Sequence, residues 1–137
     1  MSTWTKIYSY NNTGDNSITT IGVDQNDQFI VECESKLKTL DERKNYVALL
    51  TLLETDKKQF ETELKDKVTK DKINELKKEL FKFGLTVSPY WSELAINWIE
   101  IEDVDKELKE LLSSATLDKR LNQGLRNKVR QLIKEIE

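Results

Sequence analysis

The chain contains no histidine and a single cysteine, Cys33, which limits the chemistry that its side chains can perform. Without histidine there is no Ser–His or Cys–His pair to activate a nucleophile, and the usual zinc and iron ligand sets cannot form. The glycine-rich patterns G-x-x-x-x-G-K-S/T and G-x-G-x-x-G, which bind nucleotide phosphates, are also absent from the sequence. We therefore expect neither a metal nor a cofactor.

Pairs of carboxylates are the remaining candidates for acid–base chemistry. Glu93 and Glu100 would share one face of a helix, and Glu32 and Glu34 would share one face of a strand. Charged residues make up 34% of the chain, so such pairs are expected by chance. Cys33 is expected to be a half-buried strand residue, because nothing nearby in sequence would activate its thiol. A carboxylate-based hydrolase is therefore an alternative only, and we expect no catalytic residues.

The first candidate contact surface lies near the N-terminus. Trp4, Tyr8 and Tyr10 alternate with other residues, so together with Lys6 they would share one face of a strand. This aromatic face either packs against a helix or forms a patch for a partner, and the sequence leaves both open.

The second candidate surface is a basic stripe near the C-terminus. It consists of Lys119, Arg126, Arg130 and Lys134, which fall on the polar side of the predicted final helix. The stripe is either a solvated helix face or a contact for an acidic partner or a phosphate backbone.

Composition indicates one domain and argues against several classes of protein. The 137 residues fit a single domain with one core, so we expect residues 1–137 to form one. With 22 basic and 25 acidic residues, the net charge of −3 argues against general nucleic-acid binding. No apolar run approaches the roughly 18 residues of a membrane helix. No signal peptide is apparent, and the single cysteine excludes an internal disulfide framework, so we expect a cytoplasmic protein.

Residues 1–35 are expected to form a small antiparallel β-rich element. The segments 4–10, 18–23 and 28–33 are rich in β-branched and aromatic residues, as strands are. Residues 11–16 and 24–27 between them are rich in asparagine and aspartate, which favour turns. A sheet this short needs a helix packed against it to be stable.

From residue 36 onward the pattern predicts helices. Thr39 and Glu42 fit a capping box that begins a first helix, which would end near Thr55. Asp56 can begin a second helix, but the apolar stripes within residues 57–83 point about 150° apart. We therefore predict a break near Val68 with Thr69 as the next cap; the alternative is one long helix. Gly84 is expected to end this segment in the left-handed conformation.

Residues 88–100 are predicted to form the helix around which the rest packs. Ser88 suits the N-cap, and Pro89 suits the first helical position. One face of this helix is apolar and predicts a buried core, formed by Trp91, Leu94, Ala95, Trp98 and Ile99. The alternative is that Tyr90, Trp91 and Trp98 form an exposed platform for a ligand or partner.

Two further helices are predicted beyond it. One begins near Asp103, and Thr116 caps the last, with Gly124 marking a kink. The inward face of the last helix would consist of Leu121, Leu125, Val129, Leu132 and Ile136. The predicted fold is mainly α, with about five or six short antiparallel helices over residues 36–137 in a bundle or short solenoid, and the β-element makes it α+β.

A small, mildly acidic helical protein without catalytic groups favours a non-enzymatic protein–protein interaction module. An immunity protein, an antitoxin or an adaptor would fit. This interpretation predicts an exposed patch with aromatic or acidic anchors. A nucleic-acid-associated regulator using the C-terminal basic stripe is the second alternative beside the hydrolase.

Overall fold

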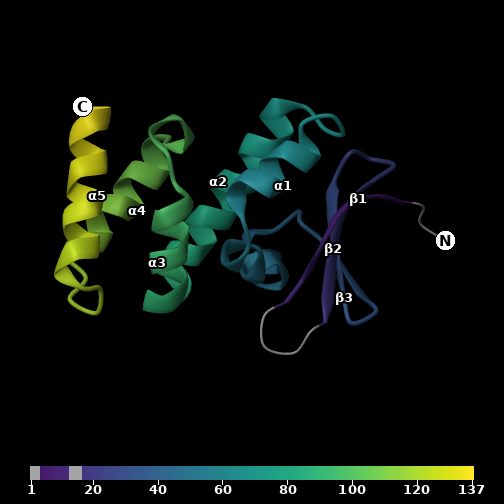
Figure 1. The fold of residues 1–137 in the computed structure, drawn as a ribbon, viewed down its shortest axis with the longest axis horizontal. Helices are drawn as coiled ribbons and strands as arrows, with labels where there is room; N and C mark the ends of the chain where they lie inside the picture. The colour runs from purple at the N-terminus through teal and green to yellow at the C-terminus, as the bar shows by residue number, and fades with distance from the viewer. Residues whose placement is uncertain (1–3, 13–16) are drawn as a thin grey trace. The chain divides into compact units, whose positions relative to one another are not determined.

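The computed structural model of the chain describes residues 4–12 and 17–137. Within these residues a four-stranded antiparallel sheet is followed by five α-helices and two 3-10 segments, which confirms the expected α+β class (Figure 1). The chain divides into two compact units, residues 1–73 and residues 74–137. The expectations of a single domain and of a bundle or solenoid stay predictions.

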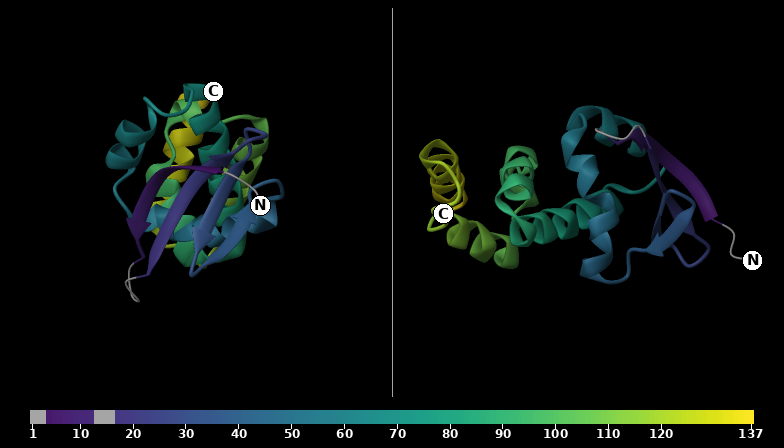
Figure 2. Two further views of the ribbon diagram at one scale, coloured as in Figure 1. Left: turned by 90° about the vertical axis from the view of Figure 1, so that its right-hand side faces the viewer. Right: turned by 90° about the horizontal axis from the view of Figure 1, so that it is seen from below.

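The sheet belongs to the first unit, and its strands follow one another in sequence order (Figure 2). β1 (Trp4–Asn11), β2 (Ile18–Asp24) and β3 (Phe29–Cys33) are the three expected strands. The Asp24 carboxylate accepts hydrogen bonds from the amides of Asn26 and Gln28, at 2.8 and 2.9 Å, which confirms the turn predicted at 24–27. Of the other predicted turn, residues 13–16 lie outside the described part of the chain.

A fourth strand, β4 (Lys36–Thr39), occupies residues that were expected to begin a helix. Glu34 and Ser35 both have positive φ, 52° and 67°, which is the backbone of a tight two-residue hairpin turn. The turn sends the chain back along β3, and the Leu40 amide extends the pairing by donating to the Phe29 carbonyl. The sequence Glu-Ser lacks the Asn-Gly signature of such turns, so the pattern concealed the hairpin.

A β-bulge in β1 overturns the prediction of one aromatic face. Lys6 pairs with Gly22, but Tyr8 pairs with Ile21, so Ile7 is an extra residue. The bulge exchanges the two faces of the strand, and both Ile7 and Tyr8 are buried. The carbonyl oxygen of Ile7 accepts a hydrogen bond from the Lys67 ammonium at 2.8 Å.

The core of the first unit lies between the sheet and two helical segments, η1 (Arg43–Glu54) and α1 (Lys57–Leu64). Tyr8 meets Phe60 of α1 edge-to-face, with ring centroids 5.3 Å apart. The Tyr10 hydroxyl donates to the Thr51 hydroxyl at 2.9 Å, because the single Thr51 hydrogen is donated to the Asn12 side-chain oxygen at 2.7 Å. Burial raises the pKa of Tyr10 to about 12.

η1 occupies the place of the predicted first helix, but it begins later, at Arg43. It is a 3-10 helix, which is wound more tightly than an α-helix. The predicted capping box is wrong: Thr39 ends β4, and Glu42 is the N-cap of η1 without a side-chain hydrogen bond. The spacing of Tyr46, Leu49, Leu50 and Leu53 in the sequence predicts one inward helix face, and all four are buried. Thr55 ends the segment, as expected.

The predicted break in residues 57–83 is confirmed. α1 ends at Leu64, and α2 (Lys70–Val87) begins after Thr69, whose hydroxyl accepts from the Lys72 amide at 3.2 Å. The prediction that Gly84 ends this helix is wrong, because α2 continues to Val87. Pro89 supplies the stop instead, since the residue before a proline is driven out of the helical region, and Ser88 has φ −164°.

In the second unit, α3 (Pro89–Trp98) has the predicted start, and its predicted buried face is confirmed in part, since Ala95 and Ile99 are buried but Leu94 is half-buried. The Ser88 hydroxyl accepts from the Trp91 amide, and Pro89 is at the first position. Trp98 is buried as expected, whereas Trp91 is half-buried. Ser92 points inward in its place, because its hydroxyl is bonded to the Leu85 carbonyl at 3.3 Å.

The remaining elements are η2 (Ile101–Asp103), α4 (Lys106–Ala115) and α5 (Gln123–Ile136), and the predicted caps are displaced. Asp105, not Asp103, caps α4. Thr116 is the C-cap of α4 and not the N-cap of the last helix, which Asn122 provides. Gly124 therefore lies in the first turn of α5, where it marks no interior kink. On the predicted inward face, Leu121, Leu125 and Val129 are buried, and Leu132 and Ile136 are half-buried.

Candidate partner-binding surface

The starts of α3 and α5 lie at the same end of the second unit (Figure 1). Residues of α3, of α5 and of the turn before α5 line an open hollow of about 230 Å³. We call it the Tyr90 surface. It is lined by Pro89, Tyr90, Glu93, Arg120, Leu121, Asn122 and Leu125. The hollow thus combines an apolar floor, an aromatic ring and two charged groups of opposite sign.

The residues that begin α3 fix the position of Tyr90 at the surface. Ser88 and Pro89 fix the first turn of α3, and Tyr90 is the second residue of that turn. Its side chain is 53% exposed. The ring is not loose, because it meets the Trp91 ring edge-to-face with centroids 4.9 Å apart and planes at 76°. A large aromatic side chain is therefore presented to solvent in a defined orientation.

The α5 side of the hollow is fixed in the same way. The Asn122 side chain accepts from the Leu125 amide at 2.7 Å and so sets where α5 begins. Leu121 and Leu125 are buried beneath it and supply the apolar floor. Pro89, Tyr90 and Glu93 therefore belong to α3 and Leu125 to α5, whereas Arg120 and Leu121 lie in the turn that leads into α5.

The two charged groups of the hollow differ in how they are engaged. Arg120 donates two hydrogen bonds to the Asp118 carboxylate, from Nε at 3.0 Å and from Nη2 at 2.9 Å. These bonds lower the pKa of Asp118 and raise that of Arg120. By contrast, within the described residues no ion pair or hydrogen bond engages the Glu93 carboxylate.

The N-terminal aromatic residues are divided between the two faces of the sheet. Tyr8 and Tyr10 are buried against the helices and are core residues. Trp4 lies on the opposite face, half-exposed, with its ring over Gly22 and the Lys6 ammonium 5.7 Å from its centre. Only Trp4 of the three is therefore placed to meet a partner.

The predicted basic stripe is only partly one helix face. Lys119 precedes α5 in the turn after α4, whereas Arg126, Arg130 and Lys134 follow one another at four-residue spacing along α5. Arg126 donates to Gln123 at 2.9 Å. Arg130 donates to Asn127 at 2.9 Å and to the Thr116 carbonyl at 3.1 Å. Two of the four cations are thus used in local hydrogen bonds.

The members of each carboxylate pair suggested by the sequence lie in different parts of the fold. Glu93 belongs to the Tyr90 surface, whereas Glu100 lines a separate open hollow of about 390 Å³ with Glu102 and Glu135. Glu32 lies in β3, but Glu34 lies in the turn after it. Cys33 is half-buried, as expected, and the Thr19 hydroxyl lies 3.6 Å from its sulfur.

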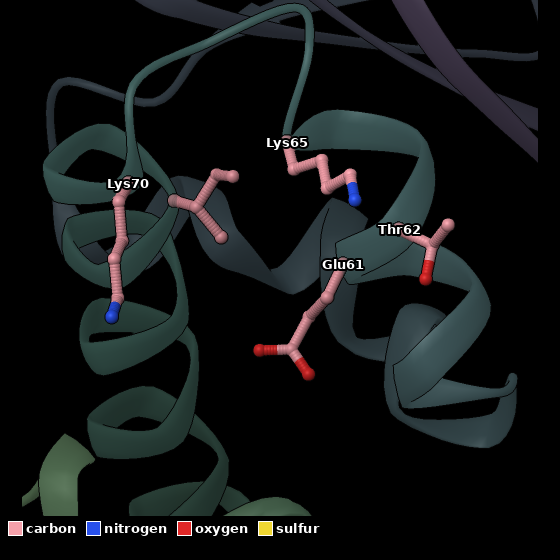
Figure 3. Close-up of a pocket in the computed structure, with 5 residues that line it drawn as sticks. Glu61, Thr62, Lys65 and Lys70 are labelled. Carbon is pink, nitrogen blue, oxygen red and sulfur yellow. The ribbon is translucent and has the colours of Figure 1, made fainter.

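Another hollow, of about 300 Å³, lies in the first unit where α1 ends and α2 begins (Figure 3). Lys65 lies on the α1 side and Lys70 on the α2 side, and the Glu61 carboxylate reaches into the space between the helices. Ile73 and the Thr62 hydroxyl complete the lining. Two ammonium groups and one carboxylate therefore share the lining of this hollow.

Three general findings bear on the whole described chain. None of its helices has both the length and the apolar character needed to span a membrane. Among residues 4–12 and 17–137, no group of three acidic or cysteine side chains is placed to hold a metal ion. Comparison of the sequence and structure with protein-family models, curated proteins and solved structures found no match.

Most of the residues that line the Tyr90 surface could not be predicted from the sequence. Tyr90 was named only in the alternative of an exposed aromatic platform, and Glu93 only as half of a carboxylate pair. Arg120 was not singled out at all. The available signal was the three-residue spacing of Tyr90 and Glu93 at the start of a capped helix, on the side away from Trp98.

Proposed function

We propose that the protein is a non-enzymatic interaction module that binds another protein through the Tyr90 surface. The observation that carries this proposal is an exposed tyrosine, held by Trp91 and set beside a hollow with a buried leucine floor. Tyrosine and arginine are enriched among the residues that contribute most to protein–protein binding energy. Arg120 stands at the rim of the same hollow.

The surface is small, so it would form the centre of an interface and not the whole of it. A stable interface buries about 800 Å² on each partner. Exposed apolar side chains of the second unit that are available to extend it include Val87 and Leu117. An immunity protein, an antitoxin or an adaptor in the cytoplasm would use a surface of this kind, and the identity of the partner decides among them.

Site-specific photocrosslinking tests the proposal. A photoreactive phenylalanine analogue is placed at position 90 in the full chain, expressed in its native source, and irradiated. The control carries the same group at Gln131, which is exposed on α5 and does not line the hollow. We expect a discrete adduct from position 90 that purified partner reproduces. Equal labelling from both positions, or none from either, would refute the proposal.

A further inference from the structure

We infer that the Tyr90 surface receives a basic side chain of the partner, held between the Tyr90 ring and the Glu93 carboxylate. The inference rests on the proposed function, and it adds the chemistry of the residue that would be recognised. Four features of the surface support it: its charges, the placement of the ring, its apolar floor and its size.

Of the two charged side chains that line the hollow, only Glu93 lacks an ion-pair or hydrogen-bond partner within the described residues. Arg120 is held in a two-bond contact with Asp118, which compensates its charge before any ligand arrives. Glu93 has no such compensation within the described residues. A cationic group entering the hollow would therefore gain an ion pair, whereas an anionic group would meet an unpaired carboxylate.

Tyr90 and Glu93 are placed to act on the same cation. They are three residues apart in α3, a spacing that brings Cβ atoms to about 5–6 Å on a helix surface. The edge-to-face contact with Trp91 leaves the Tyr90 side chain 53% exposed. The face of an aromatic ring attracts a guanidinium or ammonium group electrostatically, and a neighbouring carboxylate adds to that attraction.

The rest of the lining suits the stem of a basic side chain. Pro89, Leu121 and Leu125 offer apolar surface beside the two polar groups. Lysine and arginine carry several methylene groups, which pack on such surface while the charged end reaches a polar partner. The hollow therefore matches both ends of the side chain.

Its size also fits one side chain and not a free metabolite. Small-molecule sites occupy about 300–1,000 Å³ and enclose most of the ligand. This hollow measures about 230 Å³ and is open. It would hold one anchoring residue of a larger partner, whose other contacts would lie outside it.

Nuclear magnetic resonance titration of the full ¹⁵N-labelled chain tests the inference without knowing the partner. The probes are blocked tripeptides, glycine–arginine–glycine and glycine–lysine–glycine, with glycine–glutamate–glycine for comparison. We expect the basic peptides to shift the amides of Tyr90, Glu93 and Leu121 in a saturable manner. The acidic peptide should leave them unchanged. If neither basic peptide shifts these amides, or if all three peptides do so equally, the inference is wrong.

Variants separate the two recognition elements. Glu93→Gln removes an exposed ion pair and Tyr90→Leu removes a cation–π contact, and each should weaken arginine-peptide binding by about two- to fivefold. Tyr90→Phe keeps the ring and should retain more of the binding than Tyr90→Leu does. The control is Glu110→Gln, an exposed glutamate of α4 outside the hollow, which should change nothing. Equal weakening by Glu110→Gln would contradict the inference, because it would mean that only net charge matters.

The outcome is distinguishable from that of the proposed function. If position 90 crosslinks to a protein whose affinity is insensitive to Glu93→Gln, and no basic peptide binds, the inference fails and the proposed function stands. If basic peptides bind at Tyr90 and Glu93 but no protein adduct forms, the proposed function fails.

Discussion

Lys77 and Lys82 of α2 are both buried, and both form ion pairs within the second unit. The Lys77 ammonium lies 3.3 Å from the Asp103 carboxylate, and their side chains are 3% and 2% exposed. Asp103 also accepts a hydrogen bond from the Glu100 amide at 2.9 Å, which closes η2. A buried charge is tolerated only when it is paired, so this contact ties η2 to α2.

Removing one partner of that pair should be costly. Lys77→Met leaves the Asp103 carboxylate buried without its countercharge, so the free energy of unfolding should fall by about 3–5 kcal/mol. Urea denaturation measures the loss. Lys134→Met, at an exposed position, is the control and should change stability by less than about 0.5 kcal/mol. The double variant Lys77→Met/Asp103→Asn should recover part of the loss, and a double variant no more stable than Lys77→Met would contradict this account.

Lys82 is the second lysine, and it stands among three carboxylates. Its ammonium lies 2.8 Å from Asp105, 3.1 Å from Glu107 and 3.8 Å from Glu79. Burial raises the pKa of Asp105, but hydrogen bonds from Lys82 and from the Leu108 amide outweigh it and leave that pKa below its ordinary value of 3.8. The ionised Asp105 is therefore stabilised by folding.

This shift predicts a pH dependence of known sign. A carboxyl whose pKa is lowered by folding stabilises the protein above its unfolded pKa, and this contribution is lost as the pH falls through the folded value. Asp105→Asn keeps a good N-cap but removes the charge. The variant should therefore be less stable than the wild type at about pH 7, and the difference should shrink below about pH 3. Urea titrations at both pH values test this, and a pH-independent difference would contradict it.

At the scale of elements, periodicity predicted helices and strands better than their ends. The three strands, the break after Leu64 and the capped start of α3 were all predicted, because each has a strong local signal. β4 and the bulge at Ile7 were not, since both depend on pairing with residues distant in sequence. A helix was predicted to begin near Asp103 and another at Thr116, but Asp103 lies in η2 and Thr116 is the C-cap of α4.

The packing of Trp4 on Gly22 of β2 can be tested by substitution. The Trp4 ring lies over this glycine, and a Cβ there would overlap the ring and stand 2.5 Å from the Thr5 carbonyl oxygen. Gly22→Ala should therefore destabilise the protein by about 1–3 kcal/mol, the usual cost of overpacking. Thermal unfolding measures the effect, and Gly124→Ala in the first turn of α5 is the control. Tolerance of Gly22→Ala would mean that Trp4 does not cover β2.

The candidate site was harder to predict than the fold, for a physical reason. A helical wheel of residues 88–100 indicates one apolar face, but it cannot tell that Ser92 finds a partner in Leu85. That hydrogen bond lets Ser92 turn inward, while Trp91 is only half-buried and Tyr90 is exposed. Arg120 and Leu121 join them only through the fold, since they lie about thirty residues away in sequence.

For the whole molecule, the central structural question is whether the two units unfold together. The boundary between residues 73 and 74 falls inside α2, which runs without a break from Lys70 to Val87. We expect one cooperative transition, because separating the units would break this helix in its interior. In urea, the native cross-peaks of Ile21 in the first unit and Leu112 in the second should disappear at the same midpoint. Different midpoints would show two domains.

The proposed function requires that the partner binds at the Tyr90 surface. Its most direct test is the affinity of the crosslinked partner, once purified, for the wild type, Tyr90→Ala and the control Gln131→Ala. Tyr90 is exposed, so its loss should leave the fold intact by circular dichroism. We predict that Tyr90→Ala weakens binding by about 2 kcal/mol or more, roughly thirtyfold, and that Gln131→Ala has no effect. Equal dissociation constants for the wild type and Tyr90→Ala would contradict the account.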